Sequence, residues 1–265
     1  MPAADRTSDD LDRRASVAVS IVLPCYNEQD CLRATVPPLI DAFRRDGDDF
    51  ELILVDNGST DRTAEVIDRL VAEGLPVTKA VVAVNRGQGL GIRTGLGVAR
   101  GEIVGYVSAD GQVKPDEVAN VYRAAKRAEV PALAKARRRD RHDGLRRAII
   151  SLGYNALMKL LFPGMPSSDV NANPKFLSAE SLERMELVSD DWFLEAEIML
   201  KAQYMGLRVV EVDVSGKPRE AGSSHVRLSA ILEFLRNMLV YRFGGPWKRW
   251  RRGVRASDLM STIDG

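Results

Sequence analysis

Cysteine and histidine are scarce in this sequence, with two residues of each among its 265. Cys25 and Cys31 are too few for a disulfide framework and have no histidine at zinc-finger spacing, which favours a reduced, cytoplasmic environment. No run of about eighteen uncharged apolar residues occurs, so we expect no membrane-spanning helix. The acidic start, MPAADRTSDDLDRR, has no apolar segment like that of a signal peptide. The sequence therefore disfavours secretion and membrane spanning.

Two glycine motifs of nucleotide-binding proteins are also missing. The sequence contains no GxxxxGK[ST] phosphate loop, and its first apolar run is not followed by GxGxxG. These absences argue against a P-loop nucleotidase and a dinucleotide-dependent oxidoreductase. A nucleotide site in this chain would have to use acidic side chains, which implies a divalent cation between carboxylates and phosphates.

Charge is unevenly distributed although the formal net charge is only +1. Residues 1–120 contain 20 acidic and 13 basic residues, whereas residues 121–265 contain 17 acidic and 25 basic ones. Most of the basic excess lies in two clusters, Arg123–Arg147 and Arg242–Arg255. Such clusters favour a phosphate-bearing partner: a nucleotide, a lipid headgroup or nucleic acid.

Short β-branched runs alternate with helix-length amphipathic segments in the first half of the chain. We expect strands at Val17–Leu23, Phe50–Val55, Val77–Val84 and Glu102–Val107. We expect helices at Glu28–Arg45, Asp61–Glu73, Gln88–Arg100 and Pro115–Ala128. This alternation predicts an α/β fold with a doubly wound, mostly parallel sheet, whose ligands bind beyond the carboxyl ends of the strands.

The second half is expected to be mainly helical. The pattern predicts helices at Ala148–Phe162, Ser178–Met185, Phe193–Met205 and Leu228–Phe243, and a strand at Leu207–Val214. We expect a disordered acidic tail over 1–16, one catalytic domain over 17–225, an amphipathic helix and basic aromatic membrane-interface segment over 226–252, and a flexible tail over 253–265. Trp247–Arg252 mixes tryptophan with cations, which is typical of an anchor on an anionic membrane surface.

Polar residues follow each of the first four predicted strands. The strands lead into PCYNE (24–28), DNGSTD (56–61), NRGQG (85–89) and SADGQ (108–112). Any one of these segments has the residue types of an ordinary turn. Because the carboxyl ends of parallel strands share one edge, four together predict a ligand site there.

These motifs resemble a known family. LPCYNE, VDNGSTD, NRGQGLG and SADGQ are similar, in this order, to the nucleotide-sugar half of family 2 glycosyltransferases, which have the GT-A fold. SSDVNANPKF, DWFLEAE and PREAGSSH resemble the polyprenyl-phosphate hexose transferase branch, typified by dolichyl-phosphate mannose synthase. The resemblance extends over Val17–Phe243 and implies transfer of a hexose from a GDP-mannose- or UDP-glucose-type donor to a polyprenyl phosphate.

The resemblance implies roles for the first-half motifs. Nucleotide-binding residues would be Pro24, Tyr26, Glu28, Asp56, Ser108 and Ala109. Asp110 and Gln112 match the second aspartate and the glutamine of the motif that holds Mg²⁺ or Mn²⁺, and Asp110 would be catalytic. Ser108 replaces the first aspartate of that motif, which lowers the charge of the site.

The second-half motifs imply an acceptor site. Arg137 is the nearest match to an arginine at the diphosphate, with Arg138 and Arg139 leaving that choice open, and Arg219 would be a second catalytic arginine. Acceptor phosphate binding is implied for Arg147, Ser151, Ser224 and His225, and Asp169 matches an aspartate of the acceptor loop. Four-residue spacing also places Arg147 and Ser151 on one face of a helix.

The acceptor phosphate suggests the mechanism. A phosphate monoester has a second pKa near 6, so it is mostly a dianion at pH 7 and attacks without a general base. We expect in-line attack on the anomeric carbon with inversion, by an enzyme bound peripherally to the inner face of the membrane.

Alternatives remain open. Asp191, Glu195 and Glu197 either stabilise a helix start or bind sugar. Asp191 or Glu195 would be the base if the acceptor were a sugar hydroxyl. A nucleic-acid-binding module leaves the acidic motifs unexplained, and Ser108 raises the alternative of an inactive paralogue.

Overall fold

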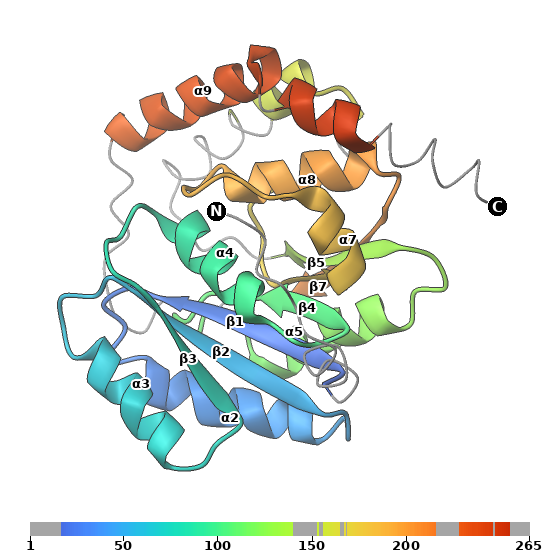
Figure 1. Ribbon diagram of the computed structural model, residues 1–265. Helices are drawn as coiled ribbons and strands as arrows, with labels where there is room; N and C mark the ends of the chain where they lie inside the picture. Colours follow the sequence, from blue (N-terminus) through green and yellow to red (C-terminus); the bar gives the residue numbers. More distant parts are fainter. Residues whose placement is uncertain are drawn as a thin grey trace.

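The computed structural model describes residues 17–139, 153, 156–164, 167, 169–215, 228–245 and 247–254, with the backbone alone at 228–235. Seven strands form one sheet in the order β3-β2-β1-β4-β6-β5-β7 (Figure 1). Their bounds are β1 Val19–Cys25, β2 Phe50–Asn57, β3 Val77–Val82, β4 Ile103–Tyr106, β5 Ala132–Arg138, β6 Lys175–Ser178 and β7 Arg208–Val214. All pairings are parallel except those of β6, which runs antiparallel to β4 and β5. The predicted doubly wound, mostly parallel sheet is confirmed.

Helices cover both faces of the sheet (Figure 1). One face packs against α2 (Leu32–Arg44), α3 (Thr63–Ala72) and α5 (Pro115–Lys126). The other packs against α4 (Gln88–Val98), α7 (Ala179–Met185) and α8 (Leu194–Tyr204), and α9 (Leu228–Phe243) lies over α8. Alternate residues of β1 serve the two layers, since Val22 faces α4 whereas Ile21 and Leu23 face α2. Burial of both faces explains why the central strands β1 and β2 are mostly apolar.

Glycine lets α4 lie directly on the sheet. A Cβ atom built at Gly95 would come within 2.3 Å of the Val22 Cγ1 atom and 2.9 Å of the Val55 Cγ2 atom. The helix therefore approaches β1 and β2 more closely than any other residue at 95 would permit. Nearer the amino end of α4, a Cβ atom at Gly91 would lie 3.0 Å from the Asn57 Cγ atom and 3.2 Å from the Pro24 Cβ atom, so this end lies at the carboxyl edge of the sheet.

The C-terminal helices differ from the sequence-based expectation. Trp247 and Trp250 were expected at a membrane interface, but they are 7% and 6% exposed and pack in the core. Their rings stack 5.2 Å apart and both contact Tyr204 of α8. The Trp250 indole also donates to the Arg184 carbonyl oxygen (3.0 Å). Residues 247–254 are helical, and Val254 at the end of this helix is buried in the same cluster.

Candidate functional site

Two neighbouring loops at the carboxyl edge of the sheet are hydrogen-bonded to each other. The loop after β1 contains Asn27, whose Oδ1 atom accepts the Thr60 amide (2.8 Å) from the loop after β2. The Glu28 amide donates to the Thr63 Oγ1 atom (2.8 Å). Asp56, at the end of β2, is 8% exposed and accepts the Ser59 amide (3.0 Å). These hydrogen bonds join the two loops into one surface at the edge of the sheet.

The loops after β1 and β2 contain residues that were expected to bind the nucleotide. Pro24 and Cys25 pair in register with Val55 and Asp56, so Pro24 and Asp56 lie at the same edge. Tyr26 follows and is 48% exposed. Cys25 is fully buried, and burial raises the pKa of its thiol, as expected for a packing residue.

The loop after β4 lies at the same edge. Asp110 accepts the Gln112 amide (3.2 Å) at its Oδ1 atom, and Gly111 turns the chain at φ +67°. The preceding Ser108 donates to the Asn173 Oδ1 atom from its amide (3.2 Å) and its hydroxyl (3.3 Å). Asn173 therefore sits beside the position that a first aspartate would occupy.

This loop offers oxygen ligands but little charge. In the part of the chain that the structure describes, no group of three or more histidine, cysteine, aspartate or glutamate side chains is placed to hold a metal ion. Magnesium commonly uses one or two carboxylates plus substrate phosphates and water. The carboxylate of Asp110 and the amide of Gln112 fit that pattern, with most of the cation's ligands supplied by a bound diphosphate.

The arginines at the end of β5 point to different partners. Arg138 makes a bidentate ion pair with Asp169, which is 3% exposed, at 2.8 and 3.0 Å. Arg137 instead contacts Asp213 (2.6 Å), and this hydrogen bond lowers the pKa of Asp213. Sequence reasoning favoured Arg137, yet Arg138 is the arginine joined to the expected acceptor loop.

Two buried lysines donate hydrogen bonds to the loop that contains Asp169. Lys135 Nζ donates to the Asp169 carbonyl oxygen (2.7 Å) and the Ser167 hydroxyl (3.2 Å), and Lys175 Nζ donates to the Val170 carbonyl oxygen (3.0 Å). Burial lowers the pKa of Lys135 to about 8 and also lowers that of Lys175. Ser167, Asp169 and Val170 are thus held by buried lysines, a role that the sequence pattern did not reveal.

The acidic residues around the start of α8 are engaged within the protein. Glu195 pairs with Lys175 and accepts the Tyr106 hydroxyl (2.6 Å). Glu197 pairs with Lys201 (2.6 Å) and accepts the Ser189 amide (2.8 Å). Asp191 accepts the Phe193 amide (2.7 Å). These contacts favour the structural interpretation of all three over a role as catalytic base.

Five expected site residues lie outside the described residues: Arg147, Ser151, Arg219, Ser224 and His225. The residues that the structure does bring to one edge are Pro24, Tyr26, Glu28, Asp56, Ser108, Ala109, Asp110 and Gln112. Asn173 was not expected as a site residue, and Arg138 was named only as an open alternative to Arg137. Strand alternation, which separates Arg138 from Arg137, was the available signal.

The sequence profile described as "Glycosyl transferase family 2" matches residues 20–167, more than half of the chain. The chain belongs to this family. The family resemblance inferred from the motifs is therefore confirmed.

Relatives of this family 2 glycosyltransferase include enzymes named for lipid-linked acceptors. An undecaprenyl-phosphate 4-deoxy-4-formamido-L-arabinose transferase of Edwardsiella ictaluri is 28% identical over 222 residues, covering 83% of this chain and 66% of that one. The dolichyl-phosphate beta-glucosyltransferase ALG5A of Trichomonas vaginalis is 25% identical over 252 residues, covering 88% and 76%. Glycosyltransferase AglD of Haloferax volcanii is 28% identical over 215 residues, which cover 77% of this chain and 34% of AglD.

Solved structures support the fold. Glucosyl-3-phosphoglycerate synthase of Mycobacterium tuberculosis, in complex with Mn²⁺ and UDP-glucose, superimposes with a TM-score of 0.66 at 21% identity. The match covers 93% of this chain and 86% of that one. The GT-A-like architecture is therefore confirmed.

Proposed function

We propose that this family 2 glycosyltransferase transfers a hexose from a nucleotide sugar of the GDP-mannose or UDP-glucose type to a polyprenyl phosphate. The observation that carries the proposal is the gathering of Asp56, Asp110 and Gln112 at one carboxyl edge, beside the fixed loop of Asp169. The relatives named for undecaprenyl and dolichyl phosphate support the acceptor class.

In this proposal the first two loops bind the nucleoside. Asp56 accepts hydrogen bonds from the base, and Pro24, Tyr26 and Glu28 line the base and ribose. Ser108 and Ala109 lie under the diphosphate. Asp110 and Gln112 would hold Mg²⁺ or Mn²⁺, which supplies positive charge to the departing nucleoside diphosphate.

The acceptor roles rest on the resemblance and on charge. Arg147 and Ser151 bind the lipid phosphate, together with Ser224 and His225, and Arg219 and Arg137 stabilise the leaving diphosphate. Asp169 holds the acceptor loop through Arg138. Charge-assisted hydrogen bonds from arginine suit phosphate because the guanidinium group is planar and bidentate.

The phosphate dianion is itself the nucleophile. One of its oxygens forms a bond to the anomeric carbon while the bond from that carbon to the nucleoside diphosphate breaks, with inversion. No side chain has to remove a proton, which agrees with the engagement of Glu195 and Asp191 in protein contacts. Catalysis is then positioning and stabilisation of the leaving charge.

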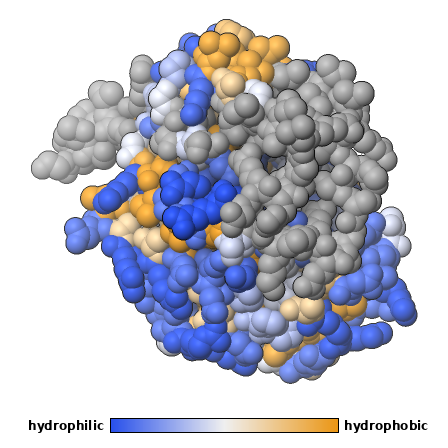
Figure 2. Space-filling view, turned by 180° about the vertical axis from the view of Figure 1, so that it is seen from behind, coloured by the Kyte–Doolittle hydropathy of each residue, from blue (hydrophilic) through white to orange (hydrophobic). Residues whose placement is uncertain are grey.

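A membrane-docking face is available on the C-terminal helices, although its composition differs from the expected one. Leu160, Leu239, Val240 and Phe243 are 75%, 50%, 50% and 63% exposed. The helix over 156–161 and α9 lie side by side, since Arg242 Nε donates to the Leu161 carbonyl oxygen (3.0 Å). Figure 2 shows an orange patch at the top of the molecule, where these helices lie in Figure 1.

The charges around this face suit an anionic leaflet. Lys159, Arg236, Lys248, Arg249 and Arg252 are exposed, and the described residues of 156–164 and 236–254 include no acidic side chain. Within the described residues, no helix is both long and apolar enough to cross a bilayer. We therefore propose peripheral binding to the inner face of the membrane through this apolar and basic face.

Flotation with lipid vesicles tests the docking face. The wild-type protein should float with vesicles that contain anionic lipid, and a Leu239→Glu and Phe243→Glu double variant should float at least fivefold less. Val71→Glu, at an exposed position on α3, is the control. Equal flotation of all three proteins would remove this face from the proposal.

The transfer reaction is tested with purified protein, Mn²⁺ and undecaprenyl phosphate. GDP-mannose, UDP-glucose and UDP-N-acetylglucosamine are offered in turn, and the product is identified by mass and anomeric configuration. A hexosyl phosphate lipid of inverted configuration is expected with one donor. Transfer to free sugars, with no lipid product from any donor, would favour the hydroxyl-acceptor alternative.

A further inference from the structure

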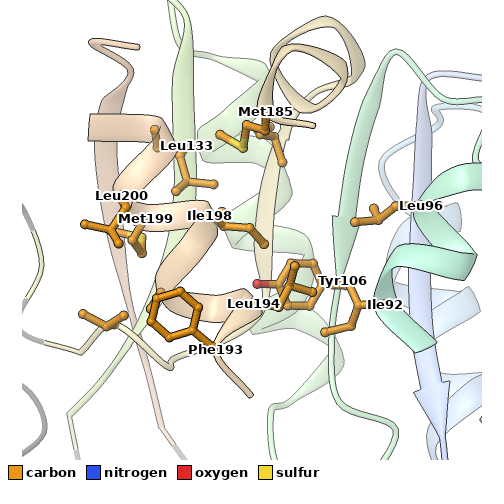
Figure 3. Packing of buried hydrophobic residues seen from close by; sticks show 14 of the residues in the cluster. Ile92, Leu96, Tyr106, Leu133, Met185, Phe193, Leu194, Ile198, Met199 and Leu200 are labelled. Carbon is orange, nitrogen blue, oxygen red and sulfur yellow. The ribbon is translucent and has the colours of Figure 1, made fainter. Parts of the chain in front are cut away.

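Trp192 differs from the other tryptophans of the chain. Of the three tryptophans, Trp247 and Trp250 are buried, whereas Trp192 is 58% exposed. Of the residues that follow it, Leu194 lies beside Tyr106 in the core (Figure 3), and Phe193 packs against Tyr241 of α9 with the ring centroids 5.0 Å apart. A single exposed apolar side chain is common on protein surfaces. Its position and its backbone contacts therefore decide whether Trp192 is a candidate for contact with a ligand.

The backbone around Trp192 is held in place by contacts with α4 and α9. The Asp190 carbonyl oxygen accepts the Leu90 amide (2.8 Å) from α4. A Cβ atom at Gly89 would lie 2.5 Å from the Asp191 carbonyl oxygen, so the segment rests directly on the start of α4. Asp191 also accepts the Phe193 amide and the Asn237 side-chain amide of α9. A ring held on a fixed backbone loses little conformational entropy when it contacts a ligand.

Trp192 lies between the proposed donor site and the proposed membrane-docking face. Gly89 follows β3 at the carboxyl edge, and Glu195, in the first turn of α8, bonds Tyr106 at the end of β4. Trp192 therefore lies along the edge at which the donor is proposed to bind. Its neighbour Asp191 is bonded to α9, whose outer residues form the proposed membrane-docking face. A lipid that extends from the bilayer to the donor has to pass between these two regions.

We propose that Trp192 is a specificity-determining residue that contacts the first isoprene units of the acceptor. The inference rests on the proposed function and adds the recognition of the lipid chain, as distinct from its phosphate. An indole ring offers a large apolar surface to a branched hydrocarbon and none of the charge that a phosphate needs. The residue would thus distinguish a prenyl phosphate from the phosphate of a water-soluble acceptor.

Kinetics separate chain recognition from chemistry. With farnesyl phosphate as acceptor, Trp192→Ala should raise the acceptor KM about tenfold, the effect of losing ~1.4 kcal/mol of apolar contact. The kcat and the donor KM should change less than about twofold. Trp192→Phe should restore most of the affinity. Val98→Ala, at an exposed position on the opposite end of α4, is the control.

Fluorescence provides a readout that does not depend on turnover. Because Trp247 and Trp250 are buried, quenching by acrylamide reports mainly on Trp192. Farnesyl phosphate should protect the fluorescence about twofold and shift the emission to the blue, while inorganic phosphate and nucleoside diphosphates should not. The Trp192→Phe variant should lack this protected signal.

The outcomes distinguish this inference from the proposed function. Unchanged acceptor KM in Trp192→Ala, together with normal lipid transfer by the wild type, would overturn the inference and keep the function. A raised donor KM, or protection by the nucleotide sugar alone, would assign the ring to the donor and overturn it equally. Absence of lipid transfer by the wild type would instead overturn the proposed function.

Discussion

At the scale of single residues, the proposed metal site depends on one carboxylate. Ser108 stands where a first aspartate was expected and bonds Asn173, which leaves Asp110 as the acidic group of its loop. A site with one carboxylate should bind a divalent cation weakly until a diphosphate completes the coordination. Metal affinity and nucleotide affinity are therefore expected to be strongly coupled.

Asp110→Asn tests this coupling. The variant should lose at least a thousandfold in transfer, because the cation and the leaving group lose their charged ligand. In thermal shift measurements, Mn²⁺ with nucleoside diphosphate should stabilise the wild type much more than either alone, and should not stabilise the variant. An unchanged unfolding midpoint without ligands is the control for folding. A fully active variant would refute the assignment.

Arg137 and Arg138 form a matched pair for a second prediction. Arg138→Gln removes the bidentate partner of the buried Asp169 carboxylate, which should cost about 2–3 kcal/mol of unfolding free energy. Arg137→Gln removes an exposed ion pair with Asp213, so its urea midpoint should match that of the wild type. Urea denaturation followed by circular dichroism measures both. Equal loss in the two variants would contradict the structural distinction.

At the scale of helices and strands, α4 provides a comparison within one element. Gly95 faces the sheet, and Gly97 has no atom within 4 Å of a Cβ built at that position. Gly95→Ala should lower the unfolding free energy by about 1–3 kcal/mol through overpacking against Val22. Gly97→Ala should raise it by about 0.5 kcal/mol, because alanine favours the helix. Urea denaturation of both variants is the measurement, and a stabilised Gly95→Ala would contradict the contact.

The sequence predicted the first four strands and their helices to within a few residues, because their apolar runs are clear and their ends carry polar turns. It also predicted that Asp56 and Asp110 share one edge. It did not predict β6, which has four residues and begins with a buried lysine, Lys175. Nor did it predict the burial of Trp247 and Trp250, because an amphipathic pattern shows which face is apolar and not what covers that face.

At the scale of the whole molecule, a polar row that is buried on three of its four strands crosses the sheet. Tyr106, Lys175, Lys135 and Glu211 are successive register partners on β4, β6, β5 and β7. The row is completed by Glu195 above Lys175 and by Ser167 between Lys135 and Glu211. It joins the antiparallel strand to its neighbours directly beneath the proposed acceptor loop, so the order of that loop depends on side chains from the entire second half of the sheet.

Lys135 makes this row sensitive to pH. Burial lowers the pKa of Lys135 from 10.5 to about 8, so between these values the unfolded chain binds more protons than the folded one. The lysine therefore costs stability below pH 8, and that cost shrinks as the pH rises towards 10.5. Between pH 7 and 9.5 the wild type should gain on the order of 1–2 kcal/mol relative to a Lys135→Met variant. Urea denaturation across this pH range measures the difference in unfolding free energy. Lys79→Met is the surface control. Parallel pH profiles of stability for all three proteins would contradict the prediction.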